Sequence, residues 1–254
     1  MSPERPDPGV ELAIDGLVIR RGAAPIDERL RPGDILGVAG LDGHGQEAFL
    51  ETLAGLRAPL GGEVAVVTAA GRTVVTGFKQ AVRQRIAYLA RDRRQEGIFP
   101  GLSILDNFAV VSFGRDLRGG LISRAGLRRR FAEWQTRLEI VAADPGAPIT
   151  ALSGGNQQKV LLARWLALNP RVLLLNDPTR GVDQRTREVL YRTFADLART
   201  EGMALVVLST EIEEVLRLCG RVLVFREGEV TARLDARGLS HGAVIDAMFG
   251  RAAA

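Results

Sequence analysis

Residues Leu152–Lys159 read Leu-Ser-Gly-Gly-Asn-Gln-Gln-Lys and stand directly before an apolar helical run. A serine hydroxyl, two glycine amides and a helix N-terminus form an anion site that needs no lysine, because the first helical N–H groups have no partner within the helix. A Ser-Gly-Gly triplet at a helix start arises readily by chance, but the whole run is far more specific. The candidate anion-binding residues are Ser153, Gly154, Gly155 and Gln157.

A second motif, Asn176–Asp183, reads Asn-Asp-Pro-Thr-Arg-Gly-Val-Asp and follows the continuous apolar run 172–175. Such runs are typical of strands that are covered on both faces of a mainly parallel sheet. The end of a buried strand is where a nucleotide-binding sheet places the carboxylates that hold metal and activate water. Taken alone, however, the motif is better explained as a strand followed by a proline turn.

A third motif, Gly40–Glu47, reads Gly-Leu-Asp-Gly-His-Gly-Gln-Glu between a strand-like run, 35–39, and a helical pattern. A strand, a glycine-rich loop and a helix N-terminus together cradle phosphates through backbone N–H groups. Gln46 stands where a lysine would reach the phosphates, and Glu47 where a hydroxyl would bind Mg²⁺. Alone, a phosphate loop and an ordinary turn are equally supported. The candidate residues are Gly40, Asp42, Gly43, His44, Gly45, Gln46 and Glu47.

Composition narrows the possible chemistry. The chain has 254 residues and a formal charge of +4, and only two of its 34 basic residues are lysines, Lys79 and Lys159. Neither is followed by Ser or Thr, so no Gly-Lys-Ser/Thr phosphate-binding triplet exists. Two distant histidines and the single Cys219 exclude a structural zinc site and a disulfide framework.

The longest apolar run, 203–208, is too short to span a bilayer, and the polar N-terminus does not resemble a signal peptide. We expect a cytosolic globular protein.

The order of elements predicts an α/β fold. Strand-like runs at 35–39, 64–67, 172–175, 205–209 and 222–225 alternate with helical patterns at 47–54, 157–168, 185–199 and 211–218. Between them, residues 79–147 contain few strand-like runs, and one helical pattern, 123–140, places Leu127, Phe131, Trp134 and Leu138 on one face. We therefore expect an α/β core formed by 1–78 and 148–254, with a mostly helical insertion at 79–147.

Together, the order and spacing of the motifs, which end with Ser209–Glu211, resemble the nucleotide-binding domain of ABC transporters across nearly the whole chain. The sequence is most similar to the C-terminal of the two ATPase domains in bacterial sugar and nucleoside importers. Members of that group carry a similar glycine-rich loop, a Tyr-x-x-Glu-Asp-Arg segment (here 88–93), and LSGGNQQK followed by PTRG[VL]D. The resemblance implies one ATP-binding domain over 1–254, with a P-loop NTPase-like, mainly parallel sheet. Such importers usually join two ATPase domains in one polypeptide, so we expect a half-size subunit or a fragment.

The sequence departs from that family pattern at the catalytic positions. By the resemblance, Gln46 replaces the Walker A lysine and Glu47 the hydroxyl that binds magnesium. Asn176 replaces the Walker B aspartate, Asp177 the catalytic glutamate, Thr210 the switch histidine and Arg91 the Q-loop glutamine. No aromatic residue precedes Gly22 to stack on an adenine. Losing one charge-assisted phosphate contact removes about 1.5–3 kcal/mol, and losing a donor aimed at developing charge costs about 10²–10³ in rate. Asp177 is the sole candidate catalytic carboxylate left, and independent ATPase activity is not expected. The signature residues and the D-loop Asp183 are retained.

ABC ATPase domains pair head to tail, so that each ATP site joins the P-loop of one domain to the signature of the other. The leading hypothesis is that this chain is the degenerate member of an asymmetric pair. It would complete the site for ATP and Mg²⁺ on a partner domain with an intact P-loop, peripherally on the cytoplasmic face of the cell membrane. Permease subunits would dock near 91–113, and a solute-binding protein would deliver the sugar or nucleoside.

Two other hypotheses stay open at this point. The first is a non-catalytic regulatory or interaction module that has kept the fold but no longer engages ATP. The losses in the P-loop favour it, whereas the retained signature and D-loop weigh against it. The second is a soluble ABC protein acting on the ribosome or DNA. A net charge of +4 over 254 residues does not supply the basic face that nucleic acid requires, so no nucleic-acid partner is expected.

Overall fold

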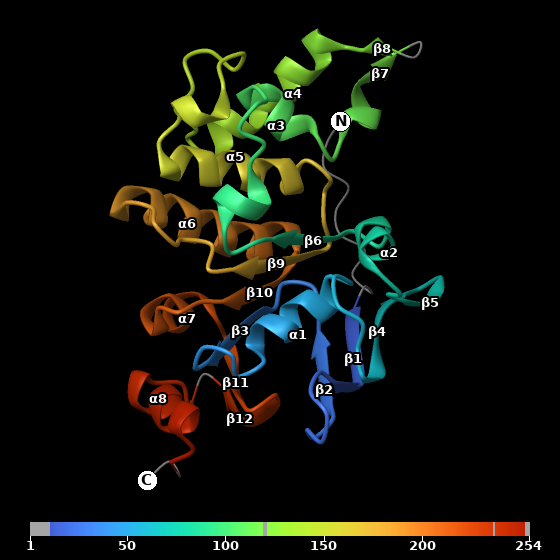
Figure 1. Ribbon diagram of the computed structural model, residues 1–254, viewed down its shortest axis with the longest axis vertical. Coiled ribbons are helices and arrows are strands. Elements are labelled where there is room, and N and C mark those ends of the chain that lie inside the picture. The colour runs from blue at the N-terminus through green and yellow to red at the C-terminus, as the bar shows by residue number, and fades with distance from the viewer. Residues whose placement is uncertain (1–10, 119–120, 236, 252–254) are drawn as a thin grey trace. The chain divides into compact units, whose positions relative to one another are not determined.

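The computed structural model describes residues 11–118, 121–235 and 237–251. The chain divides into two compact units (Figure 1). Unit 1 comprises Met1–Tyr88, Arg171–Asp177 and Phe194–Ala254, and unit 2 comprises Leu89–Pro170 and Pro178–Thr193. Each unit has its own aromatic packing, between Phe49 and Phe225 in unit 1 and between Phe108 and Phe131 in unit 2.

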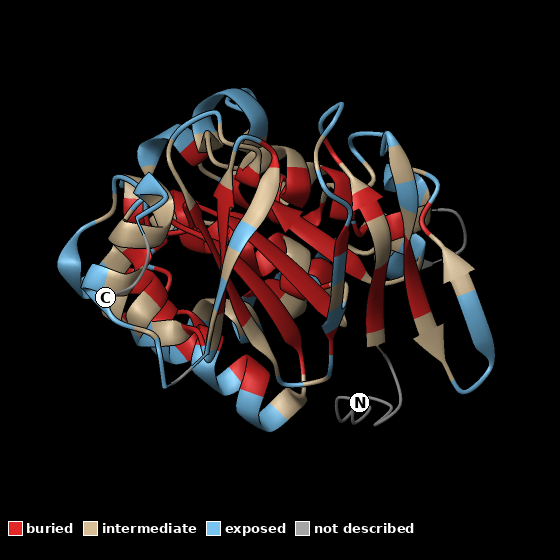
Figure 2. Cartoon of the chain, turned by 90° about the horizontal axis from the view of Figure 1, so that it is seen from below, coloured by how far each residue is buried: buried red, intermediate tan, exposed pale blue. Residues whose placement is uncertain are grey.

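A six-stranded sheet with the order β12-β11-β3-β10-β9-β6 forms the centre of unit 1. Its strands are β3 (Ile35–Gly40), β6 (Ile86–Leu89), β9 (Val172–Asn176), β10 (Ala204–Leu208), β11 (Arg221–Arg226) and β12 (Glu229–Asp235). β10 runs parallel to β3 and β9, β11 runs parallel to β3, and β12 is antiparallel to β11. Every residue of β9 and β10 is buried, and Figure 2 shows the buried class running along the sheet. The predicted α/β fold with a mainly parallel core is confirmed.

A second sheet in unit 1 is antiparallel, with the order β2-β1-β4-β5. It contains β1 (Glu11–Val18), β2 (Ile26–Leu30), β4 (Gly61–Thr68) and β5 (Gly71–Val74). Of these four strands, the sequence predicted only β4, over 64–67. It did not indicate that this strand belongs to a sheet other than the parallel one. The strand β2, Ile-Asp-Glu-Arg-Leu, buries only its two apolar ends, which explains why its sequence gives little strand signal.

Among the described residues, unit 1 also contains the helices α1 (Gln46–Leu53), α2 (Phe78–Arg83), α7 (Ile212–Leu218) and α8 (His241–Phe249), together with the part of α6 (Gln184–Glu201) from Phe194 onward. α1 packs on β3, β9 and β10. Because β3 ends at Gly40 and α1 begins at Gln46, only a short loop separates the strand from the helix. α7 packs on β3 at Gly37, where a Cβ would lie 2.8 Å from Val215 Cγ1. Glycine at this position therefore lets the helix approach the strand closely.

Unit 2 is mostly helical. It contains a π-helical turn η1 (Arg93–Gly97), α3 (Ile104–Ala109), η2 (Phe113–Asp116), the short strands β7 (Leu117–Arg118) and β8 (Leu121–Ile122), α4 (Arg124–Arg137), η3 (Ile149–Ala151), α5 (Gly154–Leu166) and the first turns of α6 (Gln184–Glu201). α5 packs on α3 and α4. The predicted apolar face of α4 is present, with Leu127, Phe131 and Leu138 buried and Trp134 half-buried.

The division between the units differs from the predicted boundaries at 78 and 147. Residues 79–88 belong to unit 1, because β6 extends the six-stranded sheet beside β9. The signature helix α5 belongs to unit 2, because it packs on the inserted helices. Among the described residues, no helix is long and apolar enough to cross a membrane.

Candidate functional site

The glycine-rich loop of unit 1 has the backbone of an anion cradle. It leaves β3 at Gly40 and enters α1 at Gln46, with positive φ at Gly43 (76°) and Gly45 (107°). A Cβ at Gly45 would lie 2.9 Å from Gly228 Cα, so both the backbone angle and the close approach require glycine. No side chain caps the start of α1, which leaves its first N–H groups facing outward from the helix end. The loop backbone therefore fits a phosphate.

The side chain of Gln46 is turned into this loop. It is 4% exposed, and its Nε2 donates hydrogen bonds to the carbonyl oxygens of Leu41, at 2.8 Å, and Gly40, at 3.4 Å. Its Oε1 is buried without a hydrogen-bond partner. The residue in the lysine position thus cross-links the loop to itself and brings no positive charge toward a phosphate.

The two residues at the end of β9 are also engaged within the unit. The Nδ2 of Asn176 donates to the Tyr88 hydroxyl at 3.2 Å. Asp177 adopts a positive φ of 45°, and its Oδ1 accepts a hydrogen bond from the backbone N–H of Thr210 at 2.7 Å. Both side chains are 4% exposed. The carboxylate of Asp177 therefore ties the end of β9 to the turn after β10.

The remaining loop residues lie at its outer surface. Asp42 is exposed, and His44 and Glu47 are half-buried. The carbonyl of His44 accepts a hydrogen bond from Gly228 N at 2.8 Å, and its Nδ1 accepts one from Glu227 N at 3.3 Å. The turn between β11 and β12 is thus attached to the loop.

This donor set fits phosphate but does not fit a magnesium–nucleotide complex. The loop offers backbone N–H groups, and Gln46, Glu47 and Asn176 stand where the resemblance to ABC ATPase domains leads one to expect a lysine, a hydroxyl and a carboxylate. Among the described residues, no group of three or more acidic, histidine or cysteine side chains is arranged to hold a metal. We therefore assign no metal-dependent step to the glycine-rich loop of this chain.

The signature in unit 2 presents its polar groups at the surface. Ser153 is exposed and caps α5, with its Oγ accepting hydrogen bonds from Asn156 N, at 3.4 Å, and Asn156 Nδ2, at 3.1 Å. The Oδ1 of Asn156 in turn accepts from Val141 N at 2.8 Å. The Ser153 oxygen is therefore engaged as an acceptor, and a hydroxyl that accepts can also donate its own O–H.

Gly155 lies against the start of α6. A Cβ at Gly155 would lie 2.6 Å from Thr186 Oγ1 and 3.2 Å from Asp183 Oδ2. Asp183 is exposed, and it accepts hydrogen bonds from Thr186 N and Thr186 Oγ1, both at 2.9 Å. These two bonds hold the pKa of Asp183 below its usual range. The signature and the D-loop, predicted from separate motifs, therefore form one surface.

Gln157 differs from the other signature candidates. It is buried, and its Nε2 donates to the carbonyls of Leu152, at 3.1 Å, and Ile149, at 3.4 Å. It therefore supports the segment before the helix. Asn156, which the sequence analysis did not select, is the amide that contacts Ser153. The signal was its position three residues after an N-cap serine, from where a side chain reaches back to the cap.

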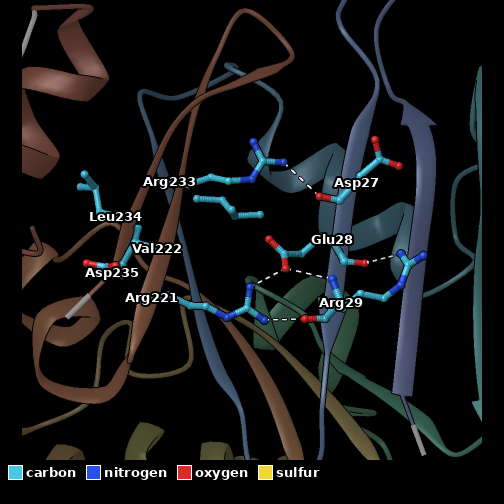
Figure 3. Close-up of a pocket in the computed structure, with 9 residues that line it drawn as sticks. Asp27, Glu28, Arg29, Arg221, Val222, Arg233, Leu234 and Asp235 are labelled. Carbon is cyan, nitrogen blue, oxygen red and sulfur yellow. Dashed lines mark hydrogen bonds and ion pairs between the residues drawn. The ribbon is translucent and has the colours of Figure 1, made fainter. Parts of the chain in front are cut away.

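A separate pocket is lined by β2, the edge strand of the antiparallel sheet of unit 1, and by β11 and β12 of the six-stranded sheet (Figure 3). It is lined by Asp27, Glu28, Arg29, Arg221, Val222, Leu223, Arg233, Leu234 and Asp235. Arg221 and Arg233 donate to the carbonyls of Arg29 and Asp27 on the edge strand β2, and Arg221 also pairs with Glu28. These contacts protect an exposed strand edge, and none of the predicted site residues lines the pocket.

Comparison with known proteins identifies the family. Residues 24–180 match the ABC transporter family. The chain is 37% identical to ribose import ATP-binding protein RbsA 1 of Rhizobium johnstonii, over 86% of this chain and 42% of that protein. It is also 37% identical to the ribose import ATP-binding protein RbsA of Geobacillus kaustophilus, over 87% of this chain and 44% of that protein. The chain thus spans less than half the length of these relatives.

Solved structures show the same fold. A dimeric bacterial ABC transporter cassette superposes with a TM-score of 0.75 at 23% identity, covering 90% of this chain and all of that one. A Clostridium perfringens protein that is part of an ABC transporter complex superposes with a TM-score of 0.69 at 18% identity, covering 88% of each chain. With the motifs, the sheet order and the family match in agreement, this chain belongs to the ABC transporter family.

Proposed function

We propose that this chain is the catalytically degenerate member of an asymmetric pair of ABC ATPase domains in a bacterial sugar importer. It supplies its signature surface, Ser153–Asn156 with Asp183, to ATP held by a partner domain with a complete P-loop. Its own Gly40–Glu47 loop is structural, or binds nucleotide without turnover.

One contrast carries this proposal. Gln46, Asn176 and Asp177 are each 4% exposed, and each bonds through one atom to a neighbouring group of its own unit, although Gln46 Oε1 and Asn176 Oδ1 have no hydrogen-bond partner. Ser153 and Asp183 are exposed and held in fixed orientations. Buried polar groups that bond within their own unit stabilise this chain. Polar groups held in fixed orientations at the surface suit contact with a ligand on another subunit.

The signature residues have chemistry that suits a terminal phosphate. Bound to the partner, ATP supplies a phosphoryl group for transfer to water, a reaction in which positioning and charge stabilisation dominate catalysis. Ser153 donates its O–H, and the first N–H groups of α5 add donors supported by the helix dipole. A donor of this kind is worth about 10²–10³ in rate. Asp183 orders the D-loop through Thr186.

The resemblance and the relatives suggest the remaining parts of the system. The two relatives described above are ribose import ATP-binding proteins, and we infer the same sugar class here, with nucleosides as the other class that the resemblance allows. Permease subunits would bind unit 2 around 91–113 and place the chain on the inner face of the cell membrane. A solute-binding protein would select the sugar outside, so this chain would not contact it.

The proposal is tested by ATPase assays on the purified chain alone and mixed with a lysine-bearing ABC ATPase domain from the same organism. We expect negligible turnover alone and stimulated turnover in the mixture. Ser153→Arg in this chain should abolish the stimulation, because it places a bulky side chain on the signature surface. Gln46→Ala serves as the matched control and should leave it within about twofold, since the loop would not turn over ATP in either case.

Two results would overturn the proposal. Turnover by the chain alone that is lost with Gln46→Ala would show a competent P-loop. Absence of stimulation with a partner that binds the chain would favour the regulatory module instead, because an interaction domain needs its surface but not its signature.

A further inference from the structure

Arg93 connects the three segments that surround the signature. It lies in η1, and its Nη1 donates to the carbonyl of Arg180 at 2.8 Å, while its Nη2 donates to the carbonyl of Gly181 at 3.3 Å. Residues 180 and 181 lead directly into the D-loop. One guanidinium thus fixes two successive carbonyls of the turn that presents Asp183, a geometry that suits the planar fork of arginine and not the single ammonium of lysine.

The same guanidinium lies against the first residue of the signature helix. A Cβ at Gly154 would be 2.5 Å from Arg93 Nη2 and 3.4 Å from its Cζ. Gly154 has no left-handed backbone angle, so its conformation does not require glycine. An added Cβ would displace the end of the Arg93 side chain from this position, so the first signature glycine leaves room for the guanidinium where it now lies.

The segment that carries Arg93 is braced on both sides. Asp92 caps η1, with its Oδ1 accepting from Arg94 N, at 2.9 Å, and Gln95 N, at 3.1 Å. At the other end, Arg164 Nη1 donates to the carbonyl of Gly97 at 2.7 Å, and Arg164 is 5% exposed. A π-helical turn that is pinned at both ends holds its side chains in fixed places, and such turns are frequent at functional sites.

Positive charges predominate around Arg93. Burial and the neighbouring Arg94 and Arg180 hold the pKa of Arg93 below its usual range, and only Asp92 opposes this effect. The start of α5 adds a further partial positive charge. A cluster of like charges at a helix N-terminus is stabilised when a phosphate approaches.

We propose that Arg93 is the positioning residue that makes closure of the mixed pair depend on the γ-phosphate. It holds the 180–181 turn and the signature start in register and places a guanidinium beside Gly154. This inference rests on the proposed function, since the phosphate belongs to ATP on the partner domain. Ser153 contacts the phosphate; Arg93 sets where Ser153 and Asp183 meet it.

The test is the dissociation constant of the full chain for its lysine-bearing partner, measured with Mg²⁺ and either ADP or a non-hydrolysable ATP analogue. The ratio of the two constants reports the γ-phosphate alone. We expect Arg93→Gln to reduce this ratio about tenfold, the lower end of a charge-assisted contact. Arg93→Lys keeps the positive charge but lacks the planar fork of the guanidinium, and it should reduce the ratio less than Arg93→Gln does. Arg128→Gln removes the same charge from an exposed residue of α4 and should leave the ratio within about twofold.

The outcomes separate this inference from the function on which it rests. A merely structural role for Arg93 would weaken binding equally with both nucleotides and leave the ratio unchanged, which would overturn the inference. If Arg93→Gln fails to fold, the ratio of the two dissociation constants is measured for Arg93→Lys instead. A ratio for Arg93→Lys that equals the wild-type ratio overturns the inference. Ser153→Arg in the same assay must abolish the difference between the two dissociation constants. If that difference persists, the proposed function itself fails and not only the role of Arg93.

Discussion

The glycine-rich loop of unit 1 and the signature surface of unit 2 use similar residues in opposite ways. In unit 1, the amide of Gln46 at the end of the loop and the carboxylate of Asp177 after β9 bond to backbone groups of their own unit and are buried. At the signature, Ser153 and Asp183 are also bonded locally, but they are exposed. Local bonding is therefore common to both regions, and the exposure of the bonded groups is what differs between them.

The largest expected effect comes from disturbing the prepared surface without changing its charge. Gly155→Ala places a methyl group 2.6 Å from Thr186 Oγ1, which must displace Thr186 and with it Asp183. We expect stimulated ATP hydrolysis by the mixed pair to fall about 10²-fold. Gly101→Ala is the matched control, because a Cβ there meets nothing within 4 Å. Equal rates for the two variants would contradict the account of the surface.

The second prediction restores the degenerate loop. Gln46→Lys combined with Glu47→Ser returns the missing cation and hydroxyl, and we expect affinity of the chain for ATP to rise about tenfold in a fluorescent-nucleotide titration. Turnover by the chain alone should stay negligible, because Asn176 and Asp177 remain internally bonded. Hydrolysis by this double variant alone would show that the end of β9 is competent.

The third prediction concerns Asp177, the sole candidate catalytic carboxylate. Asp177→Ala removes the acceptor for Thr210 N–H and should lower the free energy of unfolding by about 1 kcal/mol. Stimulated hydrolysis should stay within about twofold. Asp177→Asn keeps an acceptor oxygen and should recover most of the stability in thermal unfolding. A large loss of hydrolysis with either variant would instead make Asp177 catalytic.

The smallest effect is expected at the rim of the loop. His44→Ala removes the Nδ1 that accepts from Glu227 N, a contact at the surface. We expect a change in unfolding free energy of about 0.5 kcal/mol and no change in stimulated hydrolysis. A loss several times larger would mean that the turn between β11 and β12 depends on this contact.

Much of the fold follows from local sequence pattern. The buried strands β9 and β10 and the apolar face of α4 are continuous or periodic in sequence, and their prediction is confirmed. β6 and β2 were missed, because β6 is only four residues long within an arginine-rich region and β2 has apolar residues only at its ends.

The site was less predictable, because its decisive contacts join distant segments. The bond between Asn176 and Tyr88 and that between Arg93 and Arg180 each connect residues more than 80 positions apart. The sequence predicted which residues are present at the loop and the signature. It did not predict that Asn156 holds Ser153 or that Arg93 lies against Gly154, since both contacts depend on how the segments pack.

The central claim is that this chain completes one ATP site and does not form a second. The most direct measurement is the number of nucleotides trapped by vanadate per mixed pair during turnover, with the labelled subunit identified by photocrosslinking. We predict one trapped nucleotide, crosslinked to the lysine-bearing partner and lost when this chain carries Ser153→Arg. Two trapped nucleotides, or one crosslinked to Gly40–Glu47 of this chain and unaffected by Ser153→Arg, would contradict the account.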